Sequence, residues 1–292
     1  DVKLTLHRQL NQLTCHECGF TYRVPTECPC CGSTDLRTRG YGTEKIEGQV
    51  REAFADLKSE NGAKISEALI ARMDLDTTRT RNAYERIISD FGAGRTNILI
   101  GTQMISKGLD FDNVSVVGIV NADAMLNMPD FRAYEHAFMM MAQVSGRAGR
   151  KKKRGLVILQ TKQKDLPVIS HVVNNDYGAL YRHLIAERQA FRYPPYTHLI
   201  YVFLKHRHES TVQTAATELG SRLRQWFGSR VLGPDKPSVA KVKQQNIRKL
   251  VLKLELGIDM KRVREYLLLA QSQMLSDKRY ASLQVYYDVD PL

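Results

Sequence analysis

The stretch NILIGTQMISKGLDF, from Asn97 to Phe111, decides the fold class of this chain. It begins as a short apolar run that is typical of a buried strand and continues into a loop with glycine and polar side chains. Strands are expected over 97–100, 114–120 and 155–160, and helices over 48–57, 79–91 and 131–145. Strands that alternate with helices predict an α/β fold, with a parallel sheet that carries helices on both faces and binds ligands at the carboxyl ends of its strands.

The loop after the first of these strands offers groups for an anionic ligand. Gly101 would let a phosphate approach the backbone, Thr102 carries a hydroxyl, and Lys107 adds a positive charge. Loops between a strand and a helix are often rich in glycine and threonine for turn geometry alone. This loop is therefore a weak signal by itself.

The string QVSGRAGR, from Gln143 to Arg150, is a more specific signal. It places Arg147 and Arg150 three residues apart between glycines at the end of a predicted helix, so both guanidinium groups can reach one anionic target. A basic turn exposed to water is the alternative. We expect both loops to lie where the sheet binds its ligand.

A basic run extends this string, with six cations in the eight positions from Arg147 to Arg154. For residues 151–154 a solvated basic face is the favoured interpretation. The alternative is a rim beside the ligand cleft that tracks phosphates, and Lys151 and Lys152 are the candidates for such contacts.

All five cysteines lie between Cys15 and Cys31. Cys15 and Cys18 form one CxxC pair, and Cys28 and Cys31 form another; each pair is followed by glycine, as in a zinc ribbon, and Cys30 is a spare thiol. The metal would be structural, because about forty residues cannot build a stable core alone. The two pairs hold one zinc ion or belong to two different ions, and the alternative is two turns without metal.

The last part of the chain predicts a small α+β domain with helices on one face of a sheet, in a βαββαβ-like order. A rigid turn at Tyr193-Pro194-Pro195-Tyr196 precedes it. Strands are expected over 199–204, 250–256 and 283–289, helices over 211–227 and 260–274, and a turn over 231–234. Trp226 and Tyr266 fit helical faces, so we expect them in the core or its rim rather than on a base-stacking surface.

The composition narrows the class of protein. Among 292 residues, 43 Lys or Arg against 31 Asp or Glu give a net charge of +12, which favours a polyanionic partner. A content of 43% hydrophobic and 25% charged residues excludes wholesale disorder, collagen and disulfide-rich miniproteins. No apolar run reaches the roughly 18–20 residues of a membrane span, and the chain begins with Asp1 rather than Met. We expect a cytoplasmic protein, without membrane partners, cut from a longer chain.

Several of these strings together resemble one family. The loop from Gly101 to Phe111 followed by QVSGRAGR is similar to motifs five and six of the superfamily-two helicases. The strings GYGTEKIE, ARMDLDTTR, GTQMISKGLDF, QVSGRAGR and the closing DVDP resemble the primosomal replication-restart DNA helicases of bacteria. The resemblance covers essentially the whole chain, and its motifs follow one another in the family's order.

The resemblance implies the second of two RecA-like lobes that close on ATP and step along single-stranded DNA. Arg147 and Arg150 would then be arginine fingers for the transferring γ-phosphoryl group, and Gln143 would contact the phosphates or the attacking water. Residues that would couple the nucleotide to lobe closure are Gly108, Asp110 and Gly146. Residues that would contact DNA are Thr102, Gln103, Lys107, Lys151 and Lys152.

Two family features are absent from this sequence. It has no GxxxxGK[ST] string and no DExH-type acidic box. ATP and Mg²⁺ therefore belong to the complete protein, and we expect the isolated chain neither to hydrolyse ATP nor to unwind DNA. The family has eight cysteines that hold two zinc ions with interleaved ligand pairs, and only the last two pairs occur here.

The resemblance also implies the organisation and partners of the chain: a zinc module over 1–40, the second helicase lobe over 41–192, and a terminal domain over 193–292. The terminal domain would bind branched DNA and the acidic tail of single-stranded-DNA-binding protein, with Arg262 as the candidate for the tail carboxylate. Single-stranded DNA and other primosome proteins are further expected partners. The leading function is thus a 3′-to-5′ helicase in replication restart; the alternatives are a non-catalytic zinc-ribbon scaffold that binds nucleic acid and a motor that acts on RNA.

Overall fold

The computed structural model describes residues 5–7, 12–14, 21–28, 31–35, 42–54, 69–74, 76–78, 80–102, 105, 111, 113–149 and 155–291. The chain divides into two compact units, of which one comprises Asp1–Thr38 with His183–Leu292 and the other Arg39–Arg182. No helix in the described part of the chain is long and apolar enough to cross a membrane.

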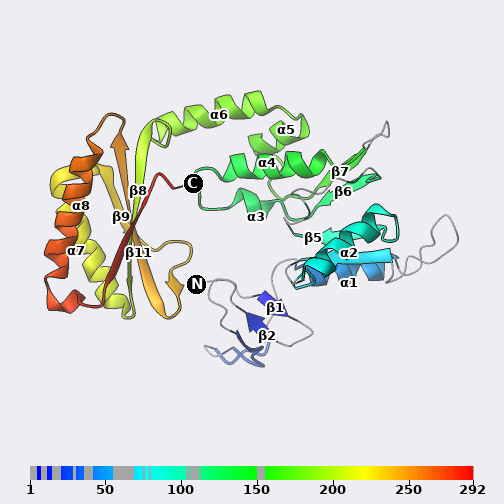
Figure 1. Cartoon of the computed structure of the whole chain (residues 1–292), viewed down its shortest axis with the longest axis horizontal. Helices are drawn as coiled ribbons and strands as arrows, with labels where there is room; N and C mark the ends of the chain where they lie inside the picture. The colour runs from blue at the N-terminus through cyan, green and yellow to red at the C-terminus, as the bar shows by residue number, and fades with distance from the viewer. Residues whose placement is uncertain are drawn as a thin grey trace. The chain divides into compact units, whose positions relative to one another are not determined.

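The unit Arg39–Arg182 alternates helices and strands along the chain (Figure 1). Its elements are α1 (Thr43–Phe54), β4 (Ile70–Met73), α2 (Arg81–Gly92), β5 (Ile98–Gly101), β6 (Val116–Ile119), α3 (Asp123–Leu126), α4 (Ala133–Ser145), β7 (Leu156–Leu159) and α5 (Pro167–Val173), and the helix α6 (Tyr177–Ala190) continues beyond the unit boundary. The α2 helix begins where Thr80 accepts a hydrogen bond from the backbone N–H of Ala83, because threonine at this position satisfies an amide that has no partner within the helix.

The strands of this unit pair in parallel, as the alternation predicts. Ile70 of β4 lies opposite Ile98 of β5, and Val116 of β6 lies opposite Leu156 of β7. Within the described residues these are two separate pairs rather than one continuous sheet. A small core lies under the first pair, where buried Met73 and Phe111 pack against apolar side chains of α2. The mixed α/β class is therefore confirmed.

The segment His183–Leu292 is an antiparallel sheet with two long helices on one face (Figure 1). Its elements are β8 (Thr197–His206), α7 (Glu209–Phe227), η3 (Gly228–Arg230), β9 (Val231–Asp235), β10 (Lys241–Val242), β11 (Gln245–Glu255), α8 (Met260–Leu275), η4 (Lys278–Tyr280) and β12 (Gln284–Val289). The strand order is β10-β11-β8-β12, and β9 also pairs with β11. The expected α+β architecture with helices on one face is confirmed.

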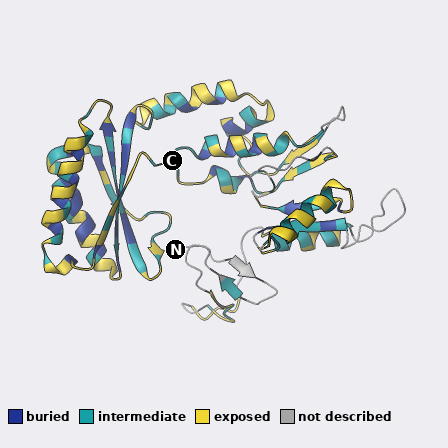
Figure 2. Ribbon diagram, in the orientation of Figure 1, coloured by how far each residue is buried: buried dark blue, intermediate teal, exposed yellow. Residues whose placement is uncertain are grey.

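The core of this unit lies between the helices and the sheet. Leu219 and Leu223 of α7 and Leu250 and Leu252 of β11 are fully buried there, and Figure 2 shows the buried residues on the inner sides of both layers. The stacked rings of Trp226 and Tyr266, 5.0 Å apart, pack against this core. That position confirms the expectation from helical spacing.

The turn predicted over 231–234 is wrong, because these residues belong to strand β9. Leu232 pairs with Val251 and Asp235 with Lys249, and the register shifts between these pairs. Gly233 lies in that irregularity with a φ of 89°. A bulge accommodates the Gly-Pro sequence within a strand, where a regular ladder would need the amide that proline lacks.

Among the described residues at the start of the chain, three short strands form an antiparallel sheet. They are β1 (Thr5–His7), β2 (Gln12–Thr14) and β3 (Thr21–Arg23). The register places Leu6 opposite Leu13, and Leu13 opposite Tyr22. The turn that carries Cys28 and Cys31 follows this sheet along the chain.

Candidate functional site

The arginine-bearing string forms a compact turn at the end of helix α4. Gly146 is the C-cap residue, and the N–H of Arg147 donates to the carbonyl of Val144 at 3.0 Å. The N–H of Gly149 then donates to the carbonyl of Val114 at 3.0 Å. Because Val114 precedes β6, this bond fixes the turn 146–149 beside the amino end of that strand.

The expectation that both loops lie at the carboxyl ends of the strands is therefore wrong for the second loop. A helix that connects parallel strands runs antiparallel to them, so α4 returns the chain to the amino ends of β6 and β7. The N–H of Leu156, the first residue of β7, donates to the carbonyl of Ser115 at 2.9 Å, at the same end as the turn. The sequence pattern predicts which residues form α4, but it does not predict at which end of the strands the carboxyl end of this helix lies.

Gly155 holds the arginine turn close to strand β7. A side chain at this position would collide with the backbone of Ala148 and Gly149, so only glycine permits the contact. Gly149 itself has a φ of 79°, a conformation that favours glycine. Two glycines thus set the path of the turn that presents Arg147.

The described side chains of the turn are accessible to a ligand. Gln143 is exposed and Arg147 is half-buried, whereas Arg150, Lys151 and Lys152 lie outside the described residues. The carboxyl end of a helix carries a partial negative charge, which disfavours an anion there. Binding of a phosphate beside α4 must therefore depend on the guanidinium groups rather than on the helix.

The first loop begins at the opposite end of its strand. β5 ends at Gly101, and the exposed Thr102 follows its carboxyl end. A side chain at position 101 would collide with the carbonyl oxygen of Met73 and with the side chain of Ile105. Glycine is thus required here by the contact between β4 and β5, a reason independent of any phosphate.

The start of the first loop does not meet the arginine turn. Thr102 follows the carboxyl end of β5, whereas Arg147 lies at the amino end of β6. The other candidates of this loop, Gln103, Lys107, Gly108 and Asp110, lie outside the described residues. The structure brings Phe111, the last residue of the loop, into the core beneath β4 and β5.

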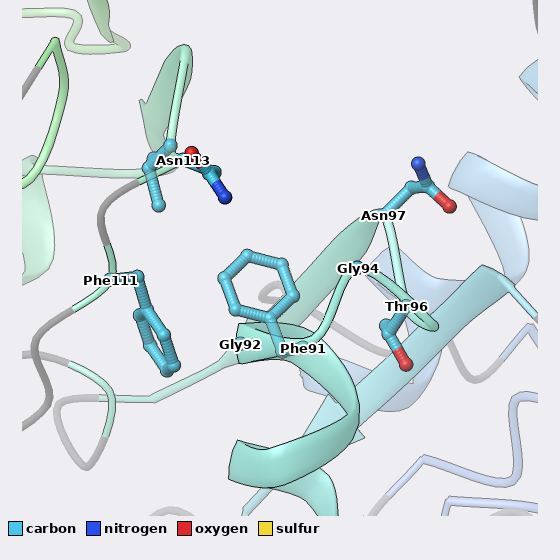
Figure 3. Close-up of a pocket in the computed structure, with 8 residues that line it drawn as sticks. Phe91, Gly92, Gly94, Thr96, Asn97, Phe111 and Asn113 are labelled. Carbon is cyan, nitrogen blue, oxygen red and sulfur yellow. The ribbon is translucent and has the colours of Figure 1, made fainter. Parts of the chain in front are cut away.

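A hollow of about 180 Å³ lies between the end of α2 and the residues that precede β6 (Figure 3). Its lining residues are Phe91, Gly92, Gly94, Thr96, Asn97, Phe111, Asn113 and Val114. The rings of Phe91 and Phe111 meet edge to face with centroids 4.7 Å apart, and in Figure 3 the Phe91 ring lies between Phe111 and the segment of Thr96 and Asn97. Val114 lies next to both the hollow and the arginine turn, because it lines the hollow and its carbonyl accepts the hydrogen bond from the N–H of Gly149. Sequence reasoning missed this hollow, whose signal is the glycine pair Gly92 and Gly94 at the end of a helix.

An acidic side chain anchors α1 to the end of β4. Asp74 accepts hydrogen bonds from the Thr43 hydroxyl at 2.6 Å and the Thr77 backbone N–H at 3.0 Å, and the Nε of Arg72 lies 3.2 Å from its carboxylate. Burial raises the pKa of Asp74, but the bonds from Thr43 and Thr77 and the charge of Arg72 outweigh burial and hold the pKa below its ordinary value.

A second carboxylate ties the ends of β6 and β7 together. Asp123 follows β6 and accepts hydrogen bonds from the Thr161 hydroxyl at 2.5 Å and from the Lys162 backbone N–H. The bond from Thr161 is the main cause that lowers the pKa of Asp123. Asp74 and Asp123 are thus both occupied by hydroxyl and amide donors, and no group of three potential metal ligands occurs among the described side chains.

The second cysteine pair lies in a tight turn. The N–H of Gly32 donates to the carbonyl of Cys28, and the N–H of Cys28 donates to the carbonyl of Ser33, both at 2.8 Å. Gly32 has a φ of 68°, and Cys31 is exposed. This geometry fits one half of a zinc knuckle, in which two thiolates project from one turn. Cys15 and Cys18, the other expected ligands, lie outside the described residues.

Arg262 lies in the first turn of α8. Asp259 caps this helix by accepting hydrogen bonds from the backbone N–H groups of Lys261 and Arg262. The Arg262 side chain is exposed. An exposed guanidinium group at the positive end of a helix is a suitable place for a carboxylate.

Comparisons with known proteins match both units. The helicase conserved C-terminal domain matches residues 53–152, and the primosomal protein N C-terminal domain matches residues 189–292. Replication restart protein PriA of Bacillus subtilis (strain 168) is 38% identical over 255 residues, which are 87% of this chain and 30% of the relative. The protein of the same name from Haemophilus influenzae is 32% identical over 290 residues, which are 98% of this chain and 37% of the relative. The one from Treponema pallidum is 37% identical and covers 82% of this chain and 35% of the relative. The chain thus spans about a third of the length of these curated relatives.

Proposed function

Because this chain is homologous to the carboxyl-terminal portion of the PriA replication restart proteins, we propose that it supplies the second motor lobe and the terminal domain of an ATP-dependent 3′-to-5′ DNA helicase. That helicase recognises stalled or branched forks and reloads the primosome. The observation that carries the proposal is the arginine turn, which Gly149 and Gly155 fix at the amino ends of β6 and β7. The sequence places a second arginine, Arg150, directly after this turn, and a turn without a ligand has no need of two arginines so close together.

In this proposal the arginine turn completes the ATP site from the second lobe. Arg147 and Arg150 stabilise negative charge on the transferring γ-phosphoryl group, and Gln143 orients the phosphates or the attacking water. Gly146 lets the turn shift when the lobes close, together with Gly108 and Asp110 of the first loop. The Mg²⁺ and the phosphate loop come from the other lobe, because this sequence contains neither motif.

The DNA contacts of the motor lie on the first loop and the basic run. We assign Thr102, Gln103 and Lys107 to the DNA backbone, and Lys151 and Lys152 to phosphates beside the cleft. The terminal domain over 193–292 binds branched DNA and primosome proteins, and Arg262 receives the acidic tail of single-stranded-DNA-binding protein. We assign residues 1–40 to the zinc module and residues 41–192 to the second helicase lobe. We place the complete enzyme in the bacterial cytoplasm.

The test supplies the first motor lobe, fused to or mixed with this chain, and measures ATP hydrolysis with and without DNA. We expect DNA-stimulated hydrolysis that Arg150→Ala lowers about a thousand-fold or more. Arg95→Ala is the matched control, since this exposed arginine of the same unit pairs with Asp90 and should leave the rate unchanged. Activity that survives Arg150→Ala removes the finger assignment, and no DNA-stimulated activity in the unmodified pair favours the non-catalytic scaffold.

The zinc proposal has a separate test. Structural zinc bound by Cys15, Cys18, Cys28 and Cys31 would supply the stability that about forty residues cannot gain from a core of their own. We predict that Cys31→Ser lowers the zinc content of the purified chain, measured by a colorimetric chelator after thiol modification. Cys30→Ser is the control and should retain the metal. Equal zinc content in the two variants would contradict this ligand set.

A further inference from the structure

The sheet of the segment His183–Leu292 has a second face, on the side away from α7 and α8 (Figure 1). Along β8, Ile200, Val202 and Leu204 point into the core, so Tyr201, Phe203 and Lys205 point to this second face. The register places Phe203 between Tyr286 of β12 and Lys249 of β11. We call Tyr201, Phe203, Lys205, Lys249 and Tyr286 the aromatic-lysine row.

The side chains of this row touch one another in a defined order. The Phe203 and Tyr286 rings are stacked with centroids 4.9 Å apart and planes 14° apart, and Tyr201 meets Phe203 edge to face at 6.1 Å. The ammonium of Lys205 lies 4.6 Å from the centre of the Tyr286 ring, and that of Lys249 lies 4.3 Å from the Tyr201 ring. Three rings thus form a continuous apolar strip with a cation at each end.

Such a strip needs an explanation, because the solvent face of an antiparallel sheet normally carries polar side chains. Tyr286 remains 39% exposed. The simplest explanation is structural: cross-strand aromatic pairs stabilise a sheet, and lysine stems can cover the rings. That explanation accounts for one pair, but the row extends over three strands and uses rings at successive outward positions of β8.

The charge around the row favours an anionic partner. Residues 183–292 contain 18 Lys or Arg and 10 Asp or Glu, so this segment carries a net charge of +8 out of +12 for the chain. Exposed Arg207, Lys241 and Lys243 lie near the Lys205 end of the strands, where Asn246 of β11 bonds to the carbonyl of Arg207.

Two acidic residues of the same face border the row. Asp288 of β12 lies opposite Tyr201, and Asp235 of β9 lies opposite Lys249. Glu255 pairs with Arg230 at 2.7 Å. At the opposite end Lys253 donates to the carbonyl of Phe191 at 2.8 Å and lies over the Tyr193 ring, so it is already engaged. Lys205 and Lys249 are the cations closest to the rings.

We propose that the aromatic-lysine row is a single-stranded nucleic-acid platform, on which unpaired bases stack against Phe203 and Tyr286 while Lys205 and Lys249 contact the adjacent phosphates. Rings on an open sheet bind bases in this way because every base has an aromatic face, and lysines follow the backbone. In a duplex the bases are already stacked on one another, so the row discriminates unpaired from paired strands. The inference rests on this face alone and on no contact of the arginine turn, although it refines the DNA binding proposed for the terminal domain.

The test measures binding of the full chain to three labelled ligands by fluorescence anisotropy, without nucleotide. The ligands are an oligothymidylate of about 12 nucleotides, an abasic strand with the same number of phosphates, and a duplex of the same length. We expect Phe203→Leu and Tyr286→Leu each to weaken oligothymidylate binding about five- to hundred-fold and to leave abasic binding unchanged. Leucine keeps apolar contact with the neighbouring strand but removes the ring.

The lysine variants should change binding in a different way from the ring variants. Lys205→Gln and Lys249→Gln should weaken oligothymidylate and abasic strands alike, and each should reduce the slope of log affinity against log salt by about 0.7. Tyr181→Leu and Lys278→Gln are the matched controls, since both side chains are exposed outside this face. Neither control should change affinity.

The results separate the possible occupants of the face. Folded Phe203→Leu and Tyr286→Leu variants that bind oligothymidylate like the unmodified chain overturn the proposal. A dimer that dissociates in the Tyr286→Leu variant, with unchanged oligonucleotide affinity, assigns the face to self-association instead. If either variant fails to fold, photo-crosslinking of iodouridine-containing strands to the unmodified chain decides: crosslinks at Phe203 or Tyr286 support the platform, and crosslinks only elsewhere contradict it. None of these outcomes depends on ATP hydrolysis, so the motor proposal stands or fails separately.

Discussion

At the scale of single residues, Asp74 shows how one carboxylate can hold two elements together. It directly follows β4, yet it accepts a hydrogen bond from the hydroxyl of Thr43, the first residue of α1. Arg72, two residues earlier on the strand, also lies 3.6 Å from Glu44 and 3.6 Å from Glu47 of α1. The contact between α1 and β4 is thus largely polar and depends on the ionised form of Asp74.

This dependence predicts an acid-sensitive contribution to stability. The folded-state pKa of Asp74 is lowered from 3.8, so the folded state binds the proton less readily than the unfolded state. The contribution is therefore complete above the unfolded pKa and is lost as the pH falls through the folded pKa. Asp74→Asn should lower the free energy of unfolding by about 1–2 kcal/mol at neutral pH, and the difference should shrink below about pH 4.

Urea unfolding of both proteins from about pH 7 to about pH 2 measures this difference. Asp165→Asn, at an exposed turn position of the same unit, is the control and should change stability by less than about 0.5 kcal/mol at every pH. A cost of Asp74→Asn that stays constant across the range would show that the side chain acts by shape rather than by charge.

At the scale of elements, the sequence correctly predicts the helices and strands whose apolar residues recur at a regular spacing. The helices over 79–91 and 131–145 and the strands over 97–100 and 155–160 lie within two residues of α2, α4, β5 and β7. These segments have a regular apolar spacing, and their ends coincide with glycines or with a capping residue such as Thr80. The prediction agrees with the structure there because the side chains that form the sequence pattern also make the contacts of the folded element.

Elements that depend on pairing partners were harder to predict. β9 contains Gly233-Pro234, a dipeptide typical of turns, and becomes a strand only because β11 offers a shifted register. The end of α4 faces the amino ends of β6 and β7 because Gly149 bonds to Val114, a residue more than thirty positions earlier. The aromatic-lysine row was visible as alternation in β8, but its third ring comes from β12, and only the register brings it beside Phe203.

At the scale of the whole molecule, the two units differ in how much apolar surface they bury. The segment with the antiparallel sheet has one large core, with fully buried leucines on α7 and β11. In the described part of the unit Arg39–Arg182, the buried side chains are divided between the core of Met73 and Phe111 and a second group around Phe138 and Met141 of α4. Hydrophobic stabilisation follows buried apolar area, so we expect the unit Arg39–Arg182 to unfold first.

Differential scanning calorimetry tests whether the units unfold separately. Met141→Ala removes a fully buried side chain from α4 and should cost about 2–5 kcal/mol, which lowers only the first transition by about 10 °C. Leu219→Ala makes a comparable change in α7 and should lower only the second. Asn82→Ala and Glu265→Ala, exposed positions on α2 and α8, are the controls and should move neither transition by more than about 2 °C. A single transition that both core variants shift equally would mean that the two units fold as one cooperative body, and the proposed domain division would fail.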